Sequence, residues 1–89
     1  MANVDIAEAG LARAVERFPE AAGTLRRLAR SDPDFREICE EYALAQTSLA
    51  QFEARPDASE RPEVGDYRTV IAELENEIDR FLKKTGPKG

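Results

Sequence analysis

The sequence predicts an all-α fold, in which an antiparallel helical hairpin is preceded by one or two short N-terminal helices. Apolar residues recur every three or four positions over 34–54 and again over 60–84. A polar segment with two prolines, residues 55–62, separates these stretches. Charged residues make up 35% of the 89-residue chain and hydrophobic residues 42%, which is typical of amphipathic helices in one small domain, residues 1–89.

The first hairpin helix is predicted over residues 33–54. Asp32 is a natural N-cap, and Pro33 fits the first helical position, where the amide hydrogen that it lacks would have no intrahelical partner. The apolar positions that follow are spaced alternately by three and four residues and form one stripe along the helix. They are Phe35, Ile38, Tyr42, Ala45, Leu49 and Phe52.

The second hairpin helix is predicted over residues 60–84, with Ser59 as its N-cap. Gly65 is unfavourable inside a helix, so Asp66 is the alternative start. Gly86 and Pro87 end the helix, and residues 85–89 are expected to form a disordered tail. The apolar stripe of this helix repeats the spacing of the first one. It consists of Val64, Tyr67, Ile71, Leu74, Ile78 and Phe81.

The two stripes are expected to form a helix-packing seam between antiparallel helices, because their lengths and spacings match. We expect Tyr42 and Tyr67 to lie at similar heights in this hairpin, with hydroxyl groups that need hydrogen-bond partners if they are buried.

Residues 4–30 are predicted to form a helical arm that is broken near Pro19 into helices over 4–17 and 19–30. A lone hairpin buries too little apolar surface to offset the conformational entropy of folding. The arm must therefore pack on the hairpin, or the chain must oligomerise. We expect both, with a dimer as the simplest closed assembly. The sequence leaves open whether the arm packs on its own hairpin or on a neighbouring subunit.

Several short motifs resemble those of the YdcH-like family of small bacterial proteins. They are Phe18-Pro19-Glu20, a short helix with Leu25 and Leu28, then Asp32-Pro33-Asp34-Phe35, and Glu41-Tyr42. The resemblance covers about residues 18–84 and implies a helical hairpin without an assigned reaction. The chain departs from the family pattern in its longer loop with two prolines, and in a second arm that carries Glu73, Glu75 and Glu77 in place of a lysine-rich run.

The composition excludes most catalytic chemistry. The chain has no histidine and one cysteine, so it contains neither a Ser-His-Asp triad nor the usual ligands of a tetrahedral zinc site. We expect no enzyme activity, no cofactor and no metal, and we interpret the glutamates as solvated. Cys39, at the edge of a stripe, is expected to be a small half-buried hydrophobic residue, with a redox role left open. Without a signal pattern or a membrane segment, a cytoplasmic location is expected.

The charge distribution favours a protein partner over nucleic acid. The net charge is −5, and residues 32–54 carry six acidic side chains and one arginine. Two clusters are therefore candidate partner contacts. One is basic and the other is acidic: Arg26, Arg27 and Arg30, and Glu37, Glu40 and Glu41. The basic cluster is expected to dock on the acidic helix of the same or another subunit, or else to bind an anion.

Taken together, these features predict a non-enzymatic helical interaction module that self-associates and binds a protein partner. The alternative is a small regulatory or nucleic-acid-associated factor that uses the arginine cluster.

Overall fold

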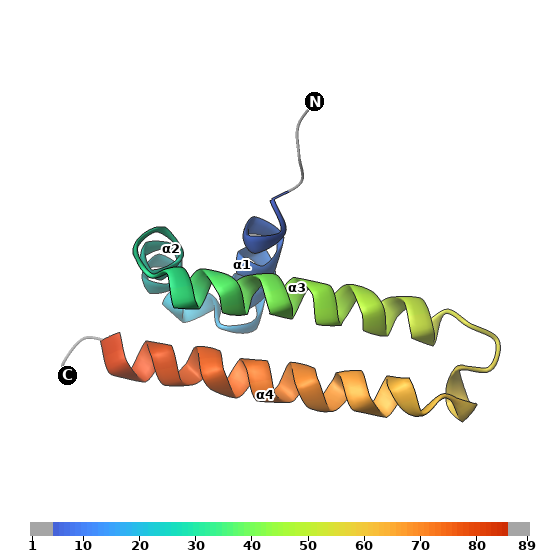
Figure 1. Ribbon diagram of the computed structural model, residues 1–89. Helices are drawn as coiled ribbons and strands as arrows, with labels where there is room; N and C mark the ends of the chain where they lie inside the picture. The colour runs from blue at the N-terminus through green and yellow to red at the C-terminus, as the bar shows by residue number, and fades with distance from the viewer. Residues whose placement is uncertain (1–4, 86–89) are drawn as a thin grey trace.

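A computed structural model of the chain describes residues 5–85, and every regular element in that range is helical. The predicted all-α fold is therefore confirmed. Four α-helices and two short 3₁₀ helices follow one another along the described chain (Figure 1). They are α1 (Ile6–Arg17), η1 (Pro19–Ala21), α2 (Ala22–Ser31), α3 (Pro33–Glu53), η2 (Ala58–Glu60) and α4 (Pro62–Thr85). Apart from Thr85, the expected tail lies outside the described residues, as does residue 4 of the expected arm.

The two long helices α3 and α4 lie side by side and antiparallel, which confirms the hairpin (Figure 1). The loop between them is at one end of the molecule, and α1 and α2 gather near the other end. Helices α1 and α2 both contact α3, and in the view of Figure 1 the path of α1 runs behind α3. The face of the hairpin that is turned towards the viewer therefore carries no other helix of residues 5–85. No helix in the described part of the chain is long and apolar enough to cross a membrane.

Aspartate side chains cap the start of α1 and of α3. Asp32 Oδ1 accepts hydrogen bonds from the backbone amides of Asp34 and Phe35, at 2.9 and 3.2 Å. Asp5 Oδ1 accepts from the amides of Ala7 and Glu8, at 3.0 and 3.4 Å. Each carboxylate satisfies amide groups that have no partner within the helix and lies at the positive end of the helix dipole.

Two proline-linked features set the remaining helix boundaries. The helical arm is interrupted at Phe18, whose backbone leaves the helical region (φ −128°, ψ 66°) because Pro19 disfavours a helical conformation in the residue before it. At the other end, α4 begins at Pro62, between the two starting points that the sequence indicated. Gly65 lies within α4 and is exposed, so its small propensity cost does not break the helix.

Aromatic contacts fix the register of the hairpin. Phe35 packs edge-to-face on Phe81 with ring centroids 5.3 Å apart, and Phe52 stacks on Tyr67 at 5.7 Å. Tyr42 lies between these pairs and contacts Glu75. The expectation that Tyr42 and Tyr67 share one height is therefore wrong. The turn between the helices, residues 54–61, is centred near residue 58, and this places position 75, about two helical turns beyond 67, opposite Tyr42.

Helix α1 crosses α3 through a patch of small residues. Ala7, Gly10 and Ala14 are the buried residues of α1. A Cβ atom at Gly10 would overlap the backbone carbonyl of Cys39 in α3, so the two backbones approach as closely as glycine allows. The arm thus packs on the hairpin of its own chain in this structure.

We expect Gly10→Ala to lower the free energy of unfolding by about 2 kcal/mol or more, because the added methyl group forces α1 away from α3. Urea denaturation followed by circular dichroism measures this change. Gly23→Ala in α2 and Gly65→Ala in α4 are matched controls, since a Cβ meets nothing within 4 Å at either position. Both controls should raise stability by about 0.5–1 kcal/mol through helix propensity. Stabilisation by all three substitutions would contradict the close crossing.

Candidate functional site

The predicted helix-packing seam consists of residues that are all at least partly buried. Buried are Phe35, Tyr42, Val64, Leu74 and Ile78, and partly buried are Ile38, Leu49, Phe52, Tyr67, Ile71 and Phe81. Ala45 is also buried. Residues seven positions apart lie on one stripe of a helix, so these side chains form two parallel rows on each helix, and the rows turn towards different sides of the hairpin.

One row on each helix faces the arm. Tyr42 and Leu49 of α3 and Ile71 of α4 line a groove together with Arg13 and Arg17 of α1. The other rows turn to the opposite side of the hairpin, which none of the described helices covers in Figure 1. We call this surface the open seam. It consists of Ile38, Ala45 and Phe52 of α3 and of Tyr67, Val70, Leu74 and Phe81 of α4.

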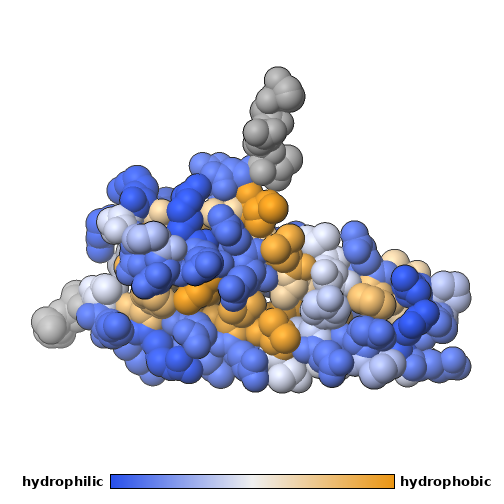
Figure 2. Space-filling model, viewed as in Figure 1, coloured by the Kyte–Doolittle hydropathy of each residue, from blue (hydrophilic) through white to orange (hydrophobic). Residues whose placement is uncertain are grey.

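The open seam is an apolar strip with polar borders. Figure 2 shows this side of the molecule, with hydrophobic residues along the middle of the boundary between α3 and α4 and further hydrophobic residues above α3, whereas the outer edge of α4 is mostly hydrophilic. Val70 is 40% exposed, whereas Ala45 and Leu74 form the buried floor of the strip. An apolar strip of this kind is a candidate surface for the packing of another molecule.

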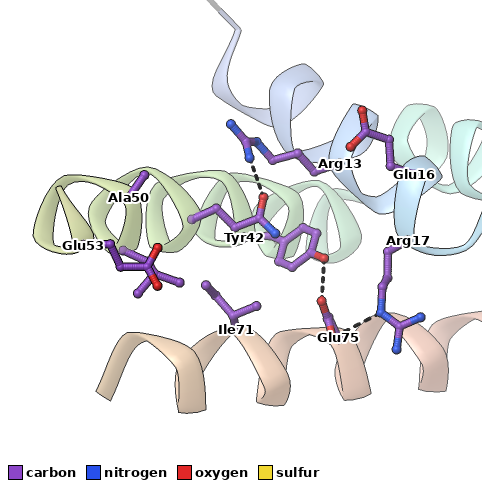
Figure 3. A pocket seen from close by; sticks show the side chains of 10 residues that line it. Arg13, Glu16, Arg17, Tyr42, Ala50, Glu53, Ile71 and Glu75 are labelled. Atoms are coloured by element: carbon purple, nitrogen blue, oxygen red, sulfur yellow. Dashed lines mark hydrogen bonds and ion pairs between the residues drawn. The ribbon is translucent and has the colours of Figure 1, made fainter. Parts of the chain in front are cut away.

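On the side opposite the open seam, a polar cluster holds helix α1 of the arm to the hairpin (Figure 3). The hydroxyl group of Tyr42 donates to Glu75 Oε2 at 2.8 Å, and Arg17 Nε pairs with Glu75 Oε1 at 3.3 Å. Arg13 donates to Gln46 Oε1 at 2.8 Å. These side chains line an open groove of about 450 Å³ between α1, α3 and α4. One carboxylate thus connects all three helices.

The environment of Tyr42 keeps its phenol protonated. Burial raises the pKa of Tyr42, and the hydrogen bond and negative charge of Glu75 raise it further, against smaller opposing effects of Arg17 and Gln46. A phenol in this state donates a hydrogen bond but does not act as a base near neutral pH. The groove therefore offers groups that position helices or bind polar ligands, and Tyr42 is not activated as a nucleophile.

Cys39 is completely buried, more deeply than the half-buried position that the sequence indicated. Burial raises the pKa of its thiol to about 11, with Arg36 lowering it and Glu40 raising it slightly. Thiolate chemistry is disfavoured in this setting. The backbone of Cys39, rather than its sulfur, makes the contact with Gly10.

The arginine cluster and the acidic cluster do not meet. Arg26, Arg27 and Arg30 are exposed on α2, and Arg27 makes one long hydrogen bond, 3.4 Å, to Thr24 Oγ1. Within residues 5–85 none of the three forms an ion pair, so the intramolecular docking on the acidic helix is not observed. Exposed on α3 are Glu37, Glu40 and Glu41. Arg36 instead reaches the arm and pairs with Asp5 at 2.8 Å. In the described range no three His, Cys, Asp or Glu side chains are grouped so that they could hold a metal ion.

Several residues of these sites were not singled out from the sequence. The hydroxyl of Tyr42 indicated that a buried partner was needed, but only the correct register identifies Glu75 as that partner. Gly10 and Ala14 do not contribute to a periodic pattern of large apolar residues, because their side chains are small. A small-residue pattern at positions 7, 10 and 14, with helical spacing, is the signal that could have located the crossing.

Comparisons with protein-family models, curated proteins and solved structures find no match to this chain. The resemblance to the YdcH-like family therefore stays a hypothesis that rests on the sequence alone.

The Tyr67→Phe variant leaves Tyr42 as the only tyrosine. In the native state of this variant we expect the pKa of the Tyr42 phenol to lie well above its ordinary value of about 10. Because the folded state raises this pKa, its contribution to stability is complete below the ordinary value and is lost as the pH rises through the native value. Ultraviolet absorbance of the phenolate measures the titration, with the same variant in urea as the control. Equal midpoints in both states would contradict a buried, hydrogen-bonded Tyr42.

Proposed function

We propose that the protein is a non-enzymatic helical interaction module that binds a protein partner through the open seam. The observation that carries the proposal is that α1 and α2 pack around one side and one end of the hairpin and leave an apolar strip uncovered along the other side. Removing apolar surface from water contributes about 25 cal/mol per Å², so a partner that covers this strip gains affinity from it.

Self-association is the second part of the proposal. The sequence favours a dimer because an isolated hairpin buries too little apolar surface. The arm supplies a second layer on the same chain, where Ala14 and Leu25 are both 0% exposed. That layer weakens the energetic need for a second copy. We therefore rank the protein partner first and a dimer second.

The alternative function is a regulatory or nucleic-acid-associated factor. It is favoured by the three exposed arginines of α2, which form no ion pair within residues 5–85. Against it stands the net charge of −5. Salt-dependent retention of DNA or RNA that is lost in an Arg26→Gln, Arg27→Gln, Arg30→Gln variant would favour this alternative. A cytoplasmic location belongs to the proposal as well, since the single cysteine is an unpaired buried thiol.

We expect Val70→Gln to weaken partner binding by about tenfold, because it places an amide in the apolar strip. Affinity capture from the native host, quantified for each retained protein, measures the effect. Ile6→Gln is the matched control, since Ile6 is 41% exposed at the start of α1, on the arm and outside the open seam. A partner retained equally by the Val70 variant, or lost equally with the Ile6 variant, would contradict binding at the open seam.

A further inference from the structure

We propose that the segment bound by the open seam is a basic amphipathic α-helix. This inference rests on the proposed function and specifies the chemistry of the partner. It follows from the shape of the strip, from the charges along its borders, and from the position of the protein's own cations at its two ends.

The shape of the strip fits a helix. Two antiparallel helices form its walls, and its apolar residues recur every seven positions on each wall, which is the pattern that a third helix packs against. From Ile38 to Phe52 the strip runs along 14 residues of α3, about 20 Å at the rise of an α-helix. A partner helix of about four turns covers this length.

The borders of the strip are acidic. By helical spacing, several positions next to the apolar rows carry exposed carboxylates on both helices, while Leu44, which is 53% exposed, follows Glu37 seven residues further along α3. On α3 the carboxylates are those of Asp34, Glu37 and Glu41, and on α4 they are those of Asp66 and Glu73. None of the five forms an ion pair within the described chain. Glu77 belongs to the same border and pairs with Arg80 at 3.4 Å. The borders thus present uncompensated negative charge beside an apolar strip.

The protein places two of its own cations at the ends of the strip. Arg55 lies over the ring of Phe52 at 5.1 Å from the centroid, and Lys84 lies over the ring of Phe81 at 6.0 Å. Aromatic faces attract cations, and both rings belong to the open seam. Between them, beside Ala45 and Leu74, the borders carry Glu41 and Glu73, and no cation of residues 5–85 pairs with either. Lysine or arginine side chains on a partner helix complement this central stretch.

A second copy of the chain fits this surface less well. Packing two open seams face to face brings acidic borders against acidic borders, and like charges in an interface weaken association. A helix with an apolar stripe and basic flanks gains both the burial and the attraction. We therefore infer a basic helix as the occupant.

Three synthetic amphipathic peptides test the inference. They share one apolar stripe that contains a tryptophan, and their flanking positions carry lysine, glutamine or glutamate. The protein has no tryptophan, so peptide fluorescence reports binding directly. We expect the lysine peptide to bind at least about tenfold more tightly than the glutamine peptide at low salt, and this advantage to shrink as salt screens the charges. The glutamate peptide should bind most weakly.

A pair of charge-reversal variants locates the effect. Glu41→Lys with Glu73→Lys should reduce affinity for the lysine peptide by about tenfold or more. Glu16→Lys with Glu20→Lys makes the same change in net charge on α1 and η1, outside the open seam, and should leave the affinity within about twofold. Circular dichroism checks that both variants retain their helices.

The outcomes separate the two proposals. If the lysine and glutamine peptides bind equally, or both variants weaken binding equally, the inference of a basic partner is wrong while docking at the open seam stands. If no peptide binds, the proposed function itself fails. If light scattering shows a dimer that the Val70→Gln substitution dissociates, a second copy is the occupant and the inference is overturned.

Discussion

The close crossing of α1 and α3 determines which side of the hairpin is covered. Gly10 lies against the backbone of Cys39, and this contact sets how near the arm can come. At that distance Arg17 reaches Glu75 on α4, and Asp5 reaches Arg36 on α3. A side chain at position 10 would move the arm outward and break this geometry. The whole arrangement, with one side of the hairpin packed and the other exposed, therefore depends on one residue without a Cβ.

The crossing also explains why charged side chains are paired on the side of the hairpin that faces the arm and mostly unpaired beside the open seam. Three basic side chains are engaged where the arm meets the hairpin, in the contacts Arg13–Gln46, Arg17–Glu75 and Arg36–Asp5. The side chains of Arg17 and Arg36 are 54% and 43% exposed, so each of these pairs contributes no more than about 1 kcal/mol to stability. Their larger consequence is that unpaired charges remain on the other side of the hairpin. Within residues 5–85, Glu77 is the one acidic residue named at the border of the open seam that forms an ion pair, so the others give this surface the chemistry for a basic ligand.

The sequence was sufficient to predict the helices and the hairpin, because the periodicity of large apolar residues is strong over both long helices. It was not sufficient to predict the register. The error at Tyr42 and Tyr67 came from the turn, whose centre depends on η2 and on the start of α4 at Pro62. The sequence predicts that the arm packs on a hairpin, but not the contacts that it uses, since these involve Ala7, Gly10 and Ala14, which contribute little hydrophobicity. An apolar pattern identifies faces that need burial, but not which neighbour buries them.

The decisive feature of the structure is the arrangement in which the arm covers one side of the hairpin and leaves the open seam to solvent. Relaxation of methyl protons by a soluble paramagnetic probe tests it directly in a dilute solution of the protein. We expect strong relaxation at Val70, which is 40% exposed, and weak relaxation at Ala14 of α1 and Ala43 of α3, which are 0% and 5% exposed. Relaxation of Ala43 as strong as that of Val70, or protection of Val70 in a monomer, would contradict it.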